Sequence, residues 1–169
     1  MKKTILTLFT ALFVLAAFSQ NDKMTKHNGE KLEVKVLKVG ETTITYKYPG
    51  EDAEQTIGKF AVANIVYGTS GRKEEITEKI VISGEDDCEK VQILTDKAQV
   101  IGLKKGEEVR GKTAGMYSFN TAGSADKKAT RRIKEAAAKT GAPFVLLTSD
   151  KNDGFGVKQS IKNGTAYTY

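Results

Sequence analysis

Cysteine and histidine are scarce in this sequence, with one of each among 169 residues. A single cysteine, Cys88, excludes an internal disulfide framework and any zinc site built from several cysteines. A single histidine, His27, excludes a histidine-pair metal site and leaves little for a Ser-His-Asp triad. We therefore expect no metal and no cofactor, and we predict that the protein is not an enzyme. A hydrolase whose carboxylates converge only in the fold remains the enzymatic alternative.

Long hydrophobic runs are also scarce. The longest, residues 5–18, falls short of the roughly 20 residues that a comfortable membrane span needs. It follows Lys2 and Lys3 and precedes small residues at positions 17 and 19, which predicts a signal peptide (residues 1–19) cleaved before Gln20. No cysteine stands directly after the run, where a lipid-attachment site would need one, so we expect no lipid anchor. The mature chain would be exported to the periplasm or secreted, with no stable membrane span.

The remaining composition is that of a folded, moderately basic protein. With 39% hydrophobic and 28% charged residues the chain can bury a core, and 16 glycines without a Gly-X-Y period exclude a collagen-like rod. The net charge of +6 would fall to +4 after cleavage. Such a charge favours solubility and contact with acidic envelope surfaces over nucleic-acid binding. Export also argues against chemistry driven by ATP or NAD.

Residues 20–82 are patterned as a β-rich module that resembles generic exported bacterial β-modules. Apolar and polar residues alternate in short runs, separated by turns at 39–41 and 68–71. The expected strands cover residues 32–37, 44–48, 56–57, 63–67 and 74–76. This spacing predicts a small antiparallel barrel or a curled sheet with one buried face.

An acidic, turn-rich segment, residues 83–90, follows this module. We interpret it as a linker, with a loop inside one continuous domain as the alternative. Cys88 lies in this segment, just before a strand-like run. We expect it to be buried as a small hydrophobe, and pairing between two chains is the alternative.

Residues 91–169 predict an α+β domain of order β-β-α-β-β, in which one helix covers a sheet. The helix is expected over residues 125–140, with Ser124 as N-cap and Gly141 as the residue that ends it. Strands are expected at residues 91–95, 107–113, 144–147 and 165–169. We expect a loop at 115–123 and a turn or bulge at 162–164.

Three segments of this half carry a family resemblance: GEEVRG, then ATRRIKEAAAKTGAPFVLLTS, then SIKNGTAY, together within residues 100–169. They resemble the RcsF/YbjQ-like group of small envelope and ring-forming α+β domains. The resemblance implies an envelope protein that acts through protein contacts, as a surface sensor in one branch and as an oligomer in the other. Metal binding, sometimes assigned to YbjQ-like domains, does not carry over, because residues 100–169 contain no His or Cys.

Two segments match the sequence patterns of ligand-binding loops, but the residues around them do not fit those loops. Residues 106–113 fit the phosphate-loop pattern G-x-x-x-x-G-K-T, yet no helical pattern follows, and Glu107 and Glu108 would repel phosphate. A strand edge or a hairpin is the better interpretation. Residues 150–154 resemble the start of a calcium loop, but Gly154 occupies a position that needs an oxygen ligand, so we interpret them as a solvated loop.

The strongest charged feature is a basic cluster on the expected outer face of the helix, formed by Lys127, Lys128, Arg131, Arg132 and Lys134. Such a cluster is usually a solvated face, and its functional interpretation is an acidic partner or an anionic lipid surface. Together with exposed loop aromatics it gives our candidate interaction surface: Tyr117, Phe119, Arg131, Arg132 and Phe155. The alternative for the aromatics is that they cover the ends of the sheet.

The sequence thus predicts an exported, non-enzymatic envelope protein, oligomeric or sensory, that contacts an envelope protein or a second copy of itself. The alternative is a periplasmic carrier of a small ligand or glycan. In that case the mouth of a first-half barrel, lined by Tyr46, Tyr48 and Tyr67, would form the binding site.

Overall fold

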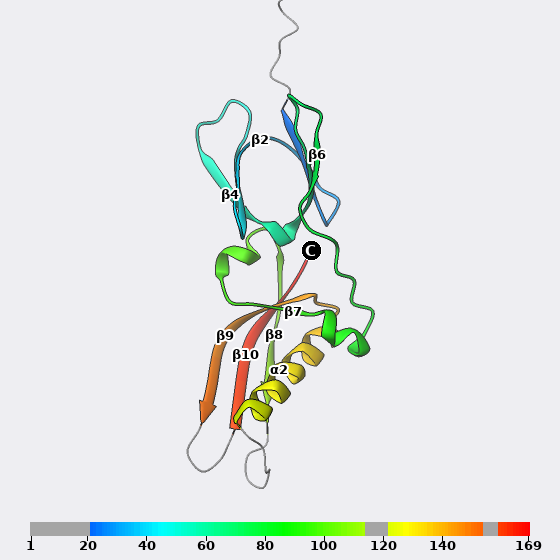
Figure 1. Cartoon of the computed structure of the whole chain (residues 1–169), viewed down its shortest axis with the longest axis vertical. Helices are drawn as coiled ribbons and strands as arrows, with labels where there is room; N and C mark the ends of the chain where they lie inside the picture. Colours follow the sequence, from blue (N-terminus) through cyan, green and yellow to red (C-terminus); the bar gives the residue numbers. More distant parts are fainter. Residues whose placement is uncertain (1–20, 114–121, 154–158) are drawn as a thin grey trace, which may run out of the picture.

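The computed structural model describes residues 21–113, 122–153 and 159–169, which form two β-rich units stacked along the long axis of the molecule (Figure 1). The first unit contains β1 (Asp22–Lys26), β2 (Lys31–Val39), β3 (Thr43–Lys47), β4 (Glu54–Gly58), the 3-10 turn η1 (Lys59–Ala61), β5 (Val62–Val66) and β6 (Lys73–Glu75). The second unit contains the 3-10 helices η2 (Glu85–Lys90) and η3 (Lys97–Val100), β7 (Gln92–Leu94), β8 (Lys104–Lys112), the helix α2 (Ala122–Lys139), β9 (Phe144–Asp153) and β10 (Gln159–Thr168). The α+β class is as predicted.

The first unit is one antiparallel sheet of six strands in the order β4-β3-β2-β1-β5-β6. It bends strongly, so that β4 and β6 face each other across the unit without pairing (Figure 1). The curled-sheet alternative is therefore confirmed, and the closed barrel is wrong. Strand β6 has only three residues before the chain leaves for the second unit, which leaves too little edge to close the sheet.

A central strand of this sheet, β1, was not expected from the sequence. It pairs with both β2 and β5, and Met24 lies opposite Leu32 on one side and Ile65 on the other. Met24 is its only apolar residue and is completely buried. With one apolar residue among five, the strand has no alternating pattern that could be detected in the sequence. It forms because the strands on both sides supply the rest of the apolar core.

The core of the first unit consists of aliphatic side chains from five strands, with Tyr46 among them. Tyr46 is only 7% exposed, and its ring packs edge-on against Tyr48 with the centroids 5.6 Å apart. Full burial of each such large side chain stabilises the fold by about 1.5–3 kcal/mol. Tyr46 therefore does not line a barrel mouth, which corrects that part of the carrier hypothesis.

The second unit is a four-stranded mixed sheet, β7-β9-β10-β8, with α2 packed across one face. Strand β7 runs parallel to β9, and the other pairs are antiparallel. The predicted order β-β-α-β-β is confirmed. Residues 162–164 lie inside β10, so the predicted turn is wrong. The register with β9 shifts between Asn163 and Gly164, but the extra residue is Thr148 of β9, so the irregularity lies at the expected place and on the partner strand.

The helix begins at Ala122, so Ser124 lies inside its first turn and is not the N-cap that the sequence predicted. Alanine favours the helical conformation, and here the helix starts two residues before Ser124. Its end is as expected: Gly141 has φ +71°, and its N–H donates to the Ala138 carbonyl at 2.9 Å.

Close contact between α2 and β8 depends on Gly111. A Cβ at this position would overlap the carbonyl oxygen of Ala129 and lie 2.8 Å from the amide nitrogen of Ile133. Glycine therefore allows the helix backbone to rest directly on the strand. Ala129 and Ile133 are fully buried at this contact.

Residues 83–90, which the sequence suggested as a linker, include η2, and η2 packs against α2. Cys88 is a free thiol and is buried with Ile133 and Val91 in the core of the second unit, which confirms the expected burial. Glu85 forms an ion pair with Lys139 at 3.2 Å across the same contact.

An aromatic and aliphatic cluster joins the two units. Phe144 of β9 is fully buried, with its ring centroid 5.0 Å from that of Phe60 in η1 and 5.5 Å from that of Tyr169. Tyr169 lies between the units (Figure 1), where its hydroxyl accepts a 2.9 Å hydrogen bond from the Ile80 amide and its ring lies 4.6 Å from the His27 ring. The two sheets therefore share a core.

Candidate functional site

Charge is distributed unequally between the two halves of the chain. Residues 21–82 contain ten basic and ten acidic side chains, whereas residues 83–169, which include the acidic η2, contain 15 basic and 11 acidic ones. The whole positive excess of the folded protein thus lies in the second unit. A charge excess of this kind steers association with partners of the opposite sign.

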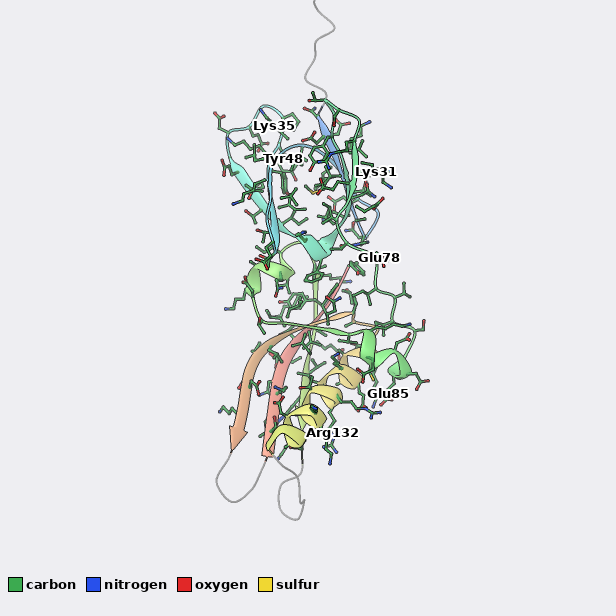
Figure 2. The ribbon with its side chains drawn as sticks, viewed as in Figure 1. Lys31, Lys35, Tyr48, Glu78, Glu85 and Arg132 are labelled. Atoms are coloured by element: carbon green, nitrogen blue, oxygen red, sulfur yellow. The ribbon has the colours of Figure 1, made fainter. Side chains whose placement is uncertain are left out.

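The exposed side of α2 contains much of this excess; we call it the basic face. It consists of six basic residues that are exposed or half-buried: Lys127, Lys128, Arg131, Arg132, Lys134 and Lys139. Figure 2 shows Arg132 on this helix, at the end of the molecule far from the first unit. Lys139 extends the basic cluster that the sequence indicated by one further turn.

The two acidic side chains on the described part of α2 are both engaged in ion pairs. Glu135 accepts a 2.8 Å hydrogen bond from Arg131 Nε, one helical turn earlier. Asp126 Oδ1 lies 2.8 Å from Lys162 Nζ, which comes from β10 beneath the helix. Neither carboxylate therefore adds an unpaired negative charge to the basic face.

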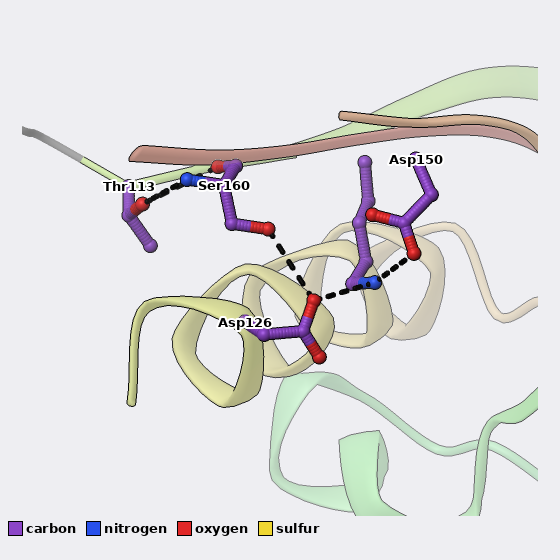
Figure 3. Close-up of polar contacts among 5 residues, drawn as sticks. Thr113, Asp126, Asp150 and Ser160 are labelled. Carbon is purple, nitrogen blue, oxygen red and sulfur yellow. Dashed lines mark hydrogen bonds and ion pairs between the residues drawn. The ribbon is translucent and has the colours of Figure 1, made fainter. Parts of the chain in front are cut away.

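Lys162 is the centre of a polar cluster between the start of α2 and the sheet. Figure 3 labels its partners Asp126 and Asp150, with Ser160 beside them. The Lys162 ammonium group contacts Asp126 at 2.8 Å and Asp150 at 2.5 Å, and its side chain is only 7% exposed. Ser160 Oγ donates to the same Asp126 oxygen at 3.4 Å. Burial acts to lower the pKa of Lys162, but the hydrogen bonds to the two carboxylates outweigh it and raise the pKa above its usual value.

This cluster holds α2 against β9 and β10, and every charge in it has a partner. It corrects the interpretation of residues 150–154 as a solvated loop, since Asp150 lies in β9 and pairs with Lys162. The sequence contained one signal for it: Lys162 alternates with Ser160 and Gly164 on the face of β10 that the helix covers.

The two arginines proposed from the sequence differ in their surroundings. Arg131 is 69% exposed and contacts Glu135 alone among the ion pairs of the described residues. Arg132 donates a hydrogen bond to the backbone carbonyl of Lys112, at the end of β8. Arg132 therefore also has a structural role, because it ties the helix to the edge of the sheet.

An open depression lies on the basic face beside η2. Its lining consists of Glu89, Asp126, Lys127, Thr130, Arg131 and Lys134. Lys134 Nζ lies 3.5 Å from the Glu89 carbonyl oxygen, which places its charge at the rim. The depression combines three cations with two carboxylates, of which Asp126 is already paired with Lys162. The remaining positive excess suits an acidic side chain of a partner.

The proposed aromatic residues are only partly located. Tyr117, Phe119 and Phe155 lie outside the described residues. Tyr67, suggested for a carrier, lines two open depressions at the far end of the first unit. Its ring is covered by the Arg72 guanidinium at 4.6 Å, and its hydroxyl donates to Glu74 at 2.9 Å.

The phosphate-loop match, residues 106–113, lies almost entirely in β8, an edge strand of the second sheet, as the sequence context predicted. Within the described ranges, no group of three or more His, Cys, Asp or Glu side chains is arranged to hold a metal ion. The helices described in the structure include none with the length and apolar character of a membrane span.

Comparison with known proteins yields no match to a family model, a curated protein or a solved structure. The RcsF/YbjQ-like resemblance thus stays a prediction.

Proposed function

We propose that this chain is an exported, non-enzymatic envelope protein that acts through protein–protein contacts, and that its basic face docks an acidic surface of the partner. The observation that carries the proposal is the charge of α2, with six basic side chains on its exposed side and both described carboxylates already paired. Export is supported by the signal-peptide pattern of residues 1–19.

The geometry suits recognition of a folded partner. The polar cluster around Lys162 and the contact at Gly111 fix α2 on its sheet, so the basic residues are presented on a rigid support. A rigid surface loses little conformational entropy on binding. Complementary charge mainly raises the association rate and favours acidic partners over others.

The test is crosslinking of the tagged protein in cells, followed by identification of what co-purifies. The test variant is Lys127→Glu/Arg131→Glu, which reverses two charges at the depression without touching Arg132. The control is Lys35→Glu/Lys38→Glu on β2, which changes the net charge equally at exposed positions of the first unit. Lys35 lies at the opposite end of the molecule (Figure 2).

We expect the wild type and the control to capture the same acidic envelope protein. The test variant should lose at least about 90% of the captured protein, which corresponds to a tenfold weaker affinity, or about 1.4 kcal/mol of binding free energy. Equal capture by both variants would remove the basic face as the docking surface.

A second candidate function is suggested by the depressions at Tyr67, where Asn21, Lys23 and Glu33 supply polar groups beside the aromatic ring. This arrangement suits a small polar ligand such as a glycan. A saccharide-dependent rise in melting temperature that Tyr67→Ala abolishes would support it. The absence of any such rise across a saccharide panel would speak against it.

A further inference from the structure

The four-stranded sheet of the second unit has two faces, and α2 covers one of them. Gly111 of β8 and Lys162 of β10 lie on the covered face, because Gly111 lies against the backbone of α2 and Lys162 pairs with Asp126 of the helix. Figure 3 shows α2 on this side of the strands. Since side chains alternate along a strand, the residues next to Gly111 and Lys162 point to the opposite face.

The strand register places six residues of this opposite face in two neighbouring rows, which we call the open face. The rows run from β8 across β10 to β9, with Lys112, Ile161 and Lys151 in one and Arg110, Asn163 and Ser149 in the next. The register of β10 shifts only nearer the first unit, so regular pairing and alternation hold in both rows.

The open face is basic. Its cations, Arg110, Lys112 and Lys151, are all exposed, and no ion pair joins them to another residue in the described ranges. The two rows contain no acidic residue, since Glu108 lies one row further, opposite Thr165. The far end of the sheet therefore presents three cations on the side that α2 does not cover.

Uncharged groups lie among these cations. Asn163 provides an amide, Ser149 a hydroxyl and Ile161 an aliphatic side chain, and each of them is half-buried. Because neighbouring strands lie about 4.8 Å apart and alternate residues about 6.8 Å apart, the Cα atoms of the cations span roughly 7 by 10 Å. This spread favours a ligand with several anionic groups over a single small anion.

From this arrangement we propose that the open face binds an acidic polysaccharide. Carboxylate or sulfate groups of such a polymer pair with the cations, and its hydroxyls form hydrogen bonds with Asn163 and Ser149. The apolar face of a sugar ring packs on Ile161. An anionic bilayer would match the charge alone, which makes it the less complete fit.

This inference goes beyond the proposed function, because the open face lies across the sheet from α2 and takes a glycan polymer in place of a protein. It is also separate from the depressions at Tyr67, which lie in the first unit. The rows have a rigid support, since Lys162 ties β10 to β9 through Asp150, and Arg132 bonds to the Lys112 carbonyl at the end of β8. A site fixed in advance loses little conformational entropy on binding.

The experiment is calorimetric titration of the exported protein, purified from cells that express the full chain, with polygalacturonate and with dextran sulfate. Neutral dextran is the control polymer, and phosphatidylglycerol vesicles are the control membrane. The test variant removes the three cations of the open face: Arg110→Gln/Lys112→Gln/Lys151→Gln. The matched control removes the same charge at exposed lysines elsewhere: Lys31→Gln/Lys38→Gln/Lys97→Gln. A melting curve of each variant verifies that it is folded.

We expect the wild type to bind at least one of the two acidic polymers and not neutral dextran. The matched control should stay within about twofold of the wild-type affinity. The test variant should bind at least about tenfold more weakly. Asn163→Ala, which changes no charge, should weaken binding by about threefold, because a hydrogen bond to the glycan is lost.

Three results would overturn the proposal: no binding of either acidic polymer, an equal loss in the test variant and the matched control, or an unaltered affinity in Asn163→Ala. Binding of the vesicles without binding of either polymer would assign the open face to a membrane and would overturn it as well.

Discussion

The two units of the molecule bury their cores in different ways and present different surfaces. The first bends a single antiparallel sheet around its own aliphatic core and has equal numbers of acidic and basic residues. The second covers a four-stranded mixed sheet with α2 and contains the positive excess. A positive charge that served solubility alone would be spread over both units. Here it is concentrated in the second unit, much of it on the exposed side of α2.

Despite this difference, the units share the cluster around Phe144, Phe60 and Tyr169. A shared apolar cluster makes the unfolding of one unit costly for the other. We therefore expect the two units to unfold together.

The largest effect is expected from Phe144→Ala. The side chain is fully buried, and its removal should cost about 3–5 kcal/mol. Because Phe144 touches both units, amide hydrogen exchange should lose protection in β2 as well as in β10. The control, Cys88→Ala, lies in the second core alone and should cost less. Unchanged protection of β2 in Phe144→Ala would show that the units are independent.

Gly111→Ala should destabilise the second unit by about 1–3 kcal/mol, because the added Cβ pushes α2 away from β8. Gly84→Ala is the matched control, since its backbone is extended and a Cβ there meets nothing within 4 Å. Urea unfolding compares the two. Equal midpoints would contradict the close contact.

Features of the fold that depend on local sequence pattern could be predicted, and features that depend on contacts distant in the chain could not. The helix, its end at Gly141 and the order of elements followed from apolar spacing and turn residues. Strand β1 did not, because Met24 alone marks it, and neither did the parallel pairing of β7 with β9, which depends on contacts distant in sequence. The reason for Gly111 is visible only when the helix lies against it.

The candidate surface was also predictable only where local spacing in the sequence defines it. The basic cluster on α2 could be read from helical spacing. The separate roles of Arg131 and Arg132 could not, since they depend on Glu135 and on the end of β8. The pairing of Asp126 with Lys162 also joins residues 36 positions apart in the chain.

Lys162→Met should cost about 0.5–1 kcal/mol near neutral pH, because the stem stays buried and the two carboxylates are partly exposed. The raised pKa of Lys162 means that its contribution is fully present below the ordinary lysine pKa and is lost as the pH rises through the higher folded value. Urea unfolding should therefore show a constant difference from pH 7 to about 9.5 that shrinks above about 10.5. A difference that grows in alkali would contradict this.

A smaller effect is expected at His27 in the junction between the units. Burial and the nearby Lys79 ammonium group lower the pKa of His27, and hydrogen bonding at Thr77 only partly offsets them. Protonation is therefore harder in the folded state, so stability should fall as the pH drops below about 6.5. His27→Asn should reduce this fall, measured by urea unfolding at pH 7.5 and 5.0. An unaltered pH dependence would exclude His27 as its source.

Whether the basic face docks a partner is tested by a photoreactive side chain at Lys127, on this face, and separately at Lys38, on β2 of the first unit. Both substitutions are at exposed lysines and should change the stability by no more than about 0.5 kcal/mol. We expect illumination in cells to link position 127, and not position 38, to one acidic envelope protein. Equal crosslinks from both positions, or none from position 127, would contradict it.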